Sequence, residues 1–103
     1  MIAAFSISPL GVGASVSDPV ADAVRLVRES GLPNETNAMF TNIEGEWDEV
    51  MAVVKRAVMT VAETSPRVGL VLKADLRAGH DIGQMSRKVA RVEERLAGDA
   101  DAQ

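Results

Sequence analysis

The spacing of apolar residues changes several times along the chain, and the order of those changes limits the fold more than any other feature. Apolar residues alternate with polar ones in short segments, which is typical of β-strands, and recur every three or four positions in longer segments, which is typical of amphipathic helices. The predicted elements are, in chain order, a strand at 2–8, a helix at 19–30, strands at 34–36 and 39–44, a helix at 46–65, a strand at 67–75 and a final helix whose apolar stripe is Met85, Val89, Val92 and Leu96.

Proline and glycine separate these segments. Pro9 and Gly11 are predicted to end the first strand, and Pro19 suits the first position of the helix that follows. Gly31 is a suitable left-handed terminator for that helix, and Pro66 stops the second helix. The chain is therefore expected to divide into compact elements joined by short loops.

Strand, helix, strand, strand, helix, strand is the order of the split βαβ fold. We predict an α+β fold, a ferredoxin-like βαββαβ sandwich with an additional C-terminal helix, formed by residues 1–97 and followed by a flexible tail at 98–103. Two helices should cover one face of a four-stranded antiparallel sheet. The other face, predicted to hold Phe40 and Val71, then needs a cover, either another copy of the chain or the C-terminal helix.

Composition narrows the classes of partner. The chain has 103 residues and no cysteine, which excludes disulfides and thiolate chemistry and favours a reducing, cytoplasmic setting. Its apolar N-terminal run stops at Ser6, far short of the roughly 20 residues of a membrane helix. With 15 acidic and 11 basic residues the net charge is −4, which disfavours nucleic acid. We therefore expect neither a membrane nor a nucleic acid as partner.

Motifs for catalysis or metal binding are weak. The loop from Gly11 to Ser15 precedes a helix but lacks the Gly-Lys-Ser/Thr of a phosphate loop, so it is either a pocket rim or a simple connector. His80 is the only histidine and is expected in an exposed loop. Asp48 and Glu49 suit a helix start better than a metal site. We predict no metal, no cofactor and no enzyme activity.

Glu44 is the acidic residue that best suits a binding role, because it ends a strand just before Gly45. Its carboxylate could project into a cleft and bind a cation or a ring-bound amino group, or it could be an ordinary surface group at the end of a strand. The two interpretations are nearly even.

Other polar residues carry the same ambiguity. Ser6 and Ser8 share one face of the first strand and could contact a ligand or an interface, while Lys73 and Asp75 could form a salt bridge or frame a polar site. Trp47 could stack on an aromatic ligand, but its place on an apolar stripe favours a core position.

Four stretches carry a more specific pattern, which spans roughly residues 2–96. They are Ile7-Ser8-Pro9-Leu10-Gly11 followed by Gly13, Ser15 and Ser17; Ala23-Val24 through Ser30-Gly31-Leu32; Met39-Phe40-Thr41-Asn42-Ile43-Glu44-Gly45 running into Asp48-Glu49-Val50; and Arg67-Val68 with Leu72-Lys73-Ala74-Asp75-Leu76-Arg77. In order and spacing these stretches resemble the family of small thiamine-binding proteins.

The resemblance implies a ferredoxin-like fold, dimers or tetramers formed by sheet pairing, and binding of thiamine or its hydroxymethylpyrimidine part. It implies a pocket lined by Ser8, Thr41 and Glu44, with Lys73 and Asp75 nearby. Two further residues, Phe40 and Asn42, flank Thr41 and complete the expected ligand-binding set: Ser8, Phe40, Thr41, Asn42, Glu44, Lys73 and Asp75.

The sequence departs from the family pattern where Phe40 replaces a common glycine, and where Ala74-Asp75-Leu76 replaces a more acidic stretch. Both changes are predicted to narrow or reshape the pocket. The expected function is non-enzymatic binding of thiamine or a related aminopyrimidine by a homo-oligomer, in vitamin salvage, transport or sensing. The alternatives are a structural or regulatory oligomer that binds another protein and, less favoured, an enzyme acting on a pyrimidine metabolite.

Overall fold

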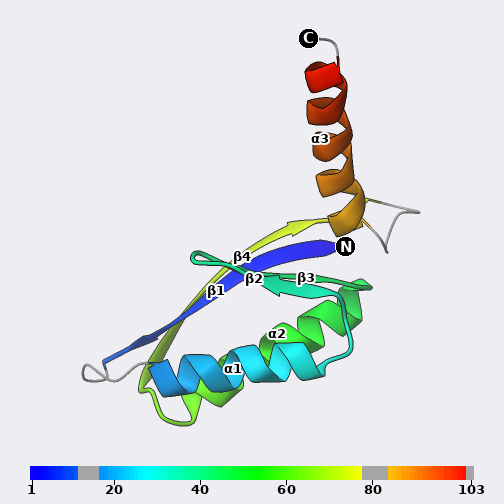
Figure 1. Cartoon of the computed structure of the whole chain (residues 1–103). Coiled ribbons are helices and arrows are strands. Elements are labelled where there is room, and N and C mark those ends of the chain that lie inside the picture. The colour runs from blue at the N-terminus through cyan, green and yellow to red at the C-terminus, as the bar shows by residue number, and fades with distance from the viewer. Residues whose placement is uncertain (12–16, 78–83, 102–103) are drawn as a thin grey trace.

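A computed structural model describes residues 1–11, 17–77 and 84–101 and is shown in Figure 1. Its elements follow the predicted order. They are β1 (Ile2–Leu10), α1 (Ser17–Glu29), β2 (Asn34–Thr36), β3 (Thr41–Glu44), α2 (Trp47–Ala62), β4 (Arg67–Asp75) and α3 (Gln84–Asp101). The α+β, ferredoxin-like arrangement predicted from the sequence is confirmed.

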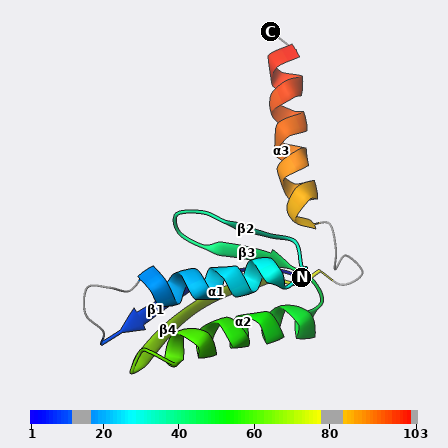
Figure 2. The same cartoon turned by 60° about the horizontal axis from the view of Figure 1, so that its bottom comes forward.

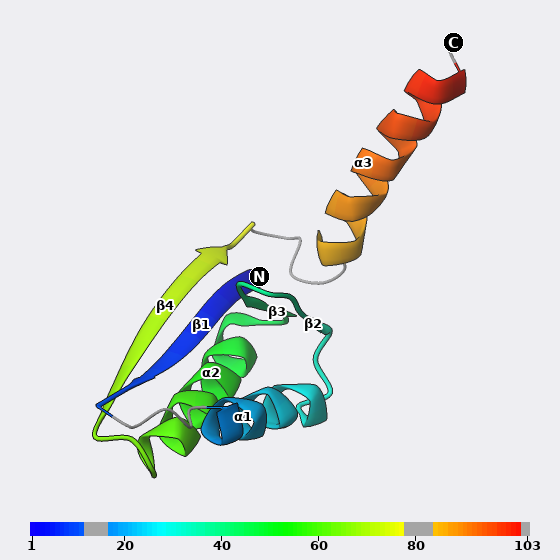
Figure 3. The same cartoon turned by 60° about the vertical axis from the view of Figure 1, so that its left-hand side comes forward.

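The sheet has four antiparallel strands in the order β2-β3-β1-β4. α1 and α2 lie together on one face of it, which we call the helix face (Figures 2 and 3). The opposite face is called the outer face. β1 lies at the centre and pairs with β4 along its whole length, from Ile2 opposite Asp75 to Leu10 opposite Arg67. It pairs with β3 over a shorter stretch, from Ile2 opposite Glu44 to Phe5 opposite Thr41.

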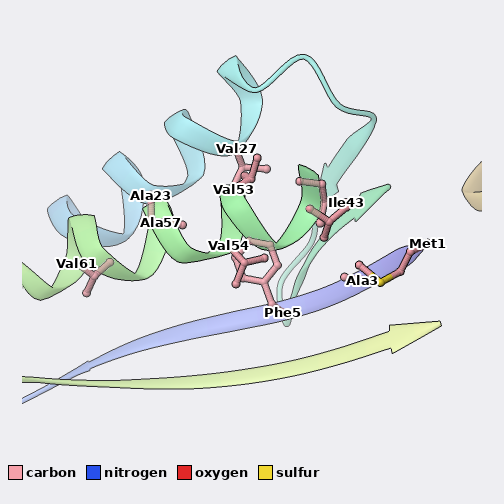
Figure 4. Close-up of a cluster of buried hydrophobic side chains, with 11 residues drawn as sticks. Met1, Ala3, Phe5, Ala23, Val27, Ile43, Val53, Val54, Ala57 and Val61 are labelled. Carbon is pink, nitrogen blue, oxygen red and sulfur yellow. The ribbon is translucent and has the colours of Figure 1, made fainter. Parts of the chain in front are cut away.

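The hydrophobic core lies between the helix face and the two helices (Figure 4). Alternation along β1 directs Ala3 and Phe5 into it, and both side chains are buried. α2 contributes buried residues at helical spacing and α1 contributes two more, and the side chains that meet here include Ala23, Val27, Ile43, Val50, Val53, Val54, Ala57 and Val61. Because most of them are small or β-branched, the helices can pack closely on the sheet.

β1 is longer than its prediction, since it continues through Pro9 to Leu10. Proline removes a backbone donor and is tolerated only where a strand has a free side. Beyond Phe5 the pairing of β1 with β3 ends, so β4 is its only neighbour in the sheet. The strand stops at Gly11, whose φ of 75° lies in the left-handed region.

The end of α1 and the start of α2 lie where the glycine and the acidic residues of the sequence predict them. Gly31, just after α1, has a φ of 80° and acts as its left-handed terminator. At the start of α2 the backbone N–H of Glu46 donates to Oε1 of Glu49 over 3.2 Å. The acidic residues here therefore serve the helix N-terminus.

The core position predicted for Trp47 is wrong. Its side chain is 50% exposed, because it occupies the first residue of α2, before the buried stripe begins at Val50. The first turn of α2 lies before the part of the helix that packs into the core. The spacing of apolar residues does not show where along the helix that packing begins.

The strand predicted at 39–44 begins only at Thr41. Residues 37–40 form a turn in which the Asn37 N–H donates to the Phe40 carbonyl over 2.9 Å. Oδ1 of Asn37 accepts the N–H groups of Met39 and Phe40, both over 2.9 Å. Asparagine is favoured in turns because its side chain satisfies nearby backbone donors in this way.

α3 projects away from the sheet and the other two helices in all three views (Figures 1 to 3). It continues to Asp101 and so includes four of the residues predicted as a tail. Val89, Val92 and Leu96 are 59%, 58% and 58% exposed.

Among the described residues, none of the helices has both the length and the apolar character needed to span a membrane.

Substituting Val54 with alanine tests the core. Val54 is 2% exposed, and removing two buried methyl groups should lower the free energy of unfolding by about 2 kcal/mol. Met59→Ala on the same helix is the control, since Met59 is 55% exposed and its loss should cost little. Urea denaturation of both variants measures the difference, and equal midpoints would contradict this description of the core.

Substituting Asn37 with alanine tests the turn. The change removes the acceptor of two backbone N–H groups and should lower the free energy of unfolding by about 1 kcal/mol. Asn37→Asp keeps an acceptor oxygen at the same place and should retain most of the stability. Urea denaturation of the two variants shows whether the acceptor oxygen or the amide group of Asn37 provides the stability. A larger loss of stability in the aspartate variant than in the alanine variant would contradict the argument.

Candidate functional site

Glu44 is a buried carboxylate at the end of β3, with only 2% of its surface exposed. Its position is set by backbone pairing on both sides. It lies opposite Ile2 of β1, and its N–H donates to the Pro33 carbonyl over 3.0 Å. Charged side chains are seldom buried to this extent without a specific reason.

Gly45, the next residue, holds the chain close to the core at this point. Its N–H donates to the Met1 carbonyl over 3.1 Å, and its own carbonyl accepts from the Met1 ammonium over 2.9 Å. A Cβ at Gly45 would lie 3.3 Å from both terminal carbons of Leu32 and 3.4 Å from Val50. A side chain at this position would therefore be crowded, so glycine suits the close packing here rather than a turn.

A cavity of about 910 Å³ opens beside Glu44, between the outer face of the sheet and the first turns of α3. We call it the Glu44 cavity. Its lining combines polar groups with an apolar wall: Ile2, Pro33, Asn34, Glu35, Asn42, Glu44, Met85, Ser86, Val89 and Ala90. Its volume falls within the range typical of sites for small organic ligands.

A hydrogen bond joins α3 to this cavity. The backbone N–H of Met85 donates to Oε2 of Glu44 over 3.2 Å. Met85 is the second residue of α3, so its N–H is one of the four that a helix cannot satisfy internally. Glu44 therefore stabilises the N-terminus of α3 from a distant part of the chain.

A second, smaller cavity of about 180 Å³ lies on the helix face, between α1 and the hairpin of β2 and β3. Its walls are mostly apolar and it is lined by Phe5, Ser6, Ile7, Val20, Ala23, Val24, Val27, Thr36, Asn37, Ala38, Met39, Phe40 and Thr41. A space of this size holds about one six-membered ring. It lacks a carboxylate.

The predicted ligand-binding residues of β3 and its turn are divided between these two cavities. Asn42 and Glu44 line the Glu44 cavity, whereas Phe40 and Thr41 line the smaller one. Alternation along the strand separates Thr41 from its neighbours at 42 and 44, because successive side chains point to opposite faces. Thr41 is buried on the helix face, where its hydroxyl lies 3.5 Å from that of Thr36.

The predicted placement of Phe40 on the outer face is wrong. Phe40 belongs to the turn at 37–40 and precedes the strand, so the period of two does not extend to it. It lines the cavity on the helix face instead.

Ser8, Lys73 and Asp75 lie on the outer face but line neither cavity. Ser8 is opposite Gly69, toward the far end of β1. Lys73 is opposite Ala4 and Asp75 is opposite Ile2, so both lie on the far side of β1 from Glu44.

Of the ten residues that line the Glu44 cavity, the sequence predicted Asn42 and Glu44, and Glu35 and Met85 are among the eight that it missed. Glu35 lies directly opposite Asn42, and the register of the hairpin would have revealed it once the turn was known. Met85 was assigned to an apolar stripe, and nothing in its own sequence context indicates that its backbone N–H reaches Glu44.

Several other candidates remain outside the site. His80 and residues 12–15 of the glycine-containing loop lie outside the described residues. Within the described ranges no three histidine or acidic side chains gather closely enough to hold a metal ion. The chemistry that this arrangement offers is that of a buried carboxylate beside amides and apolar side chains, which suits a cation or N–H donors on an organic ring.

Comparison with known proteins identifies the family to which this chain belongs. A family model described as thiamine-binding protein matches residues 3–93. A UPF0045 protein of Mycobacterium bovis is 56% identical over 97 residues, which cover 93% of this chain and 94% of the relative.

Solved structures agree on the fold. A Methanocaldococcus jannaschii structure is 40% identical, with a TM-score of 0.79 over 90% of this chain and 95% of that one. A Thermotoga maritima protein, provisionally assigned to thiamine biosynthesis or salvage, has a TM-score of 0.76 over 88% of this chain and 96% of its own, and its 23% identity supports the fold alone. The family match and the two closely related sequences show that this chain belongs to the thiamine-binding protein family.

Proposed function

We propose that this protein binds thiamine or a related aminopyrimidine in the Glu44 cavity, without catalysing a reaction, in vitamin salvage, transport or sensing. The observation that carries the proposal is the 2% exposure of Glu44 beside a cavity of about 910 Å³. The family description supports the ligand class and names binding rather than catalysis. The predicted cytoplasmic location stays a prediction.

Burial makes Glu44 a stronger partner for a cation than an exposed carboxylate. Two unit charges 4 Å apart attract by about 1 kcal/mol in bulk water and by about 4 kcal/mol at the effective dielectric constant of a site near a protein surface. Glu35 lines the same cavity but is exposed, so its contribution should be smaller.

The rest of the cavity suits the shape of thiamine, which joins an aminopyrimidine to a cationic thiazolium ring. Asn34 and Asn42 bring amide groups that can accept and donate hydrogen bonds, while Ile2 and Pro33 form an apolar wall for flat rings. The cavity on the helix face has room for about one ring only. Size and charge therefore both favour the Glu44 cavity for the whole molecule.

Substituting Glu44 with glutamine tests the proposal while keeping the shape of the side chain. Loss of a buried charge-assisted contact should weaken thiamine binding at least about tenfold. Isothermal titration calorimetry with thiamine and with hydroxymethylpyrimidine measures the effect.

Glu63→Gln is the matched control, because Glu63 is an exposed glutamate at the C-terminal end of α2 and lines neither cavity. Its affinity should equal that of the unchanged protein. Unchanged affinity in the Glu44 variant, or no binding of either ligand by the unchanged protein, would contradict the proposed site.

The proposal includes a homo-oligomer, a dimer or tetramer. Its support is the exposed stripe of α3, where Val89, Val92 and Leu96 share one side of a helix that projects from the body. Val71 on the outer face is also 59% exposed. Exposed apolar side chains that share one side of a helix are typical of interfaces.

The same exposed stripe favours the second candidate function, a structural or regulatory oligomer that binds another protein. In that case the stripe would contact a chain of different sequence. The two candidates differ in whether purified protein associates by itself and whether it binds thiamine.

Introducing lysine on opposite sides of α3 tests self-association. Val92→Lys places a charge in the stripe and should convert the oligomer to smaller species. Glu94→Lys introduces the same residue on the opposite side of the helix and should leave the assembly intact. Light scattering after size-exclusion chromatography measures the mass of each variant, and a monomeric unchanged protein would instead favour the partner of different sequence.

A further inference from the structure

We infer that the first turn of α3 competes with a bound cation for Glu44, so that ligand binding and docking of α3 oppose each other. The inference rests on the proposed function and assigns a mode of regulation to the same site. Its basis is one hydrogen bond, one shared cavity and the polarity of a helix terminus.

The cavity and the docking site of α3 are the same place. Met85, Ser86, Val89 and Ala90 form its α3 side, and Glu44 belongs to the opposite wall. The Met85 N–H donates to Glu44 Oε2 over 3.2 Å, so the carboxylate that would hold a cation also holds the helix. Farther along α3, Val92 and Leu96 are 58% exposed, and the helix extends away from the body (Figure 3).

Charge decides the sign of the coupling. The N-terminus of a helix carries a partial positive charge of roughly half a unit, concentrated on its first N–H groups. At α3 that end is directed at Glu44. A cation bound to Glu44 would be repelled by the partial positive charge of the helix N-terminus. It would also compete with the Met85 N–H for the same carboxylate. The cation should therefore bind better when the first turn of α3 has released the carboxylate.

Coupling between two binding events is reciprocal. If docked α3 weakens cation binding, a bound cation weakens α3 docking by the same factor. α3 also carries the exposed stripe of Val89, Val92 and Leu96, so its position would determine where that stripe is presented. Ligand binding would thereby change how copies of the chain associate.

A pair of substitutions at Met85 isolates the backbone N–H. Met85→Ala shortens the side chain and keeps the N–H, whereas Met85→Pro also removes the N–H. Proline is tolerated in the first turn of a helix, where this donor has no partner within the helix. Measured by calorimetry, the proline variant should bind thiamine about two- to fivefold more tightly than the alanine variant, the range expected of a helix-terminus interaction. Equal or weaker binding by the proline variant would overturn the inference.

A second measurement does not depend on the proline variant. The chain has no cysteine, so spin labels can be attached at Lys55→Cys on α2 and Arg91→Cys on α3, both exposed positions. Saturating thiamine should shift or broaden the distance distribution between the two labels. A distribution that thiamine leaves unchanged, in protein shown to bind it, would overturn the inference.

The two measurements separate this inference from the proposed function. If no variant and no unchanged protein binds thiamine, the proposed function fails and the competition fails with it. If all bind with equal affinity and the label distances stay the same, the proposed function stands and only the competition is overturned.

Discussion

The burial of one face of the sheet beneath α1 and α2 is the constraint on which the rest of the structure depends. β1 supplies Ala3 and Phe5 to that layer, and α2 covers them with valines such as Val50 and Val54. Once alternate residues of each strand are committed to this core, the remaining ones must lie on the outer face. The faces on which Thr41, Asn42 and Glu44 lie follow from that division.

Glu44 is the residue for which the division matters most. It is placed on the outer face, next to a backbone held tightly at Gly45, and is covered there by the first turn of α3. A carboxylate on an open sheet would be solvated by water and would distinguish poorly between ligands. Beneath a helix terminus it is instead buried and bordered by a cavity.

The elements were largely predictable because each rests on local chemistry. The strand at Arg67–Asp75 was predicted at its observed bounds, and Gly31 ends α1 through its positive φ as expected. The exceptions have local causes that spacing does not reveal. The turn at 37–40 shortens β3, and the one-sided pairing of β1 beyond Phe5 permits Pro9 within a strand.

By itself, the sequence determined the fold, the family pattern and the candidacy of Glu44, since these depend on periodicity, breaker residues and residue type. Only the tertiary structure decided that Thr41 and Glu44 face different cavities and that Lys73 lies across β1 from both. It also decided that the backbone of Met85 meets Glu44. The physical reason is that contact between residues 41 positions apart depends on packing, and a backbone N–H is the same in every residue but proline.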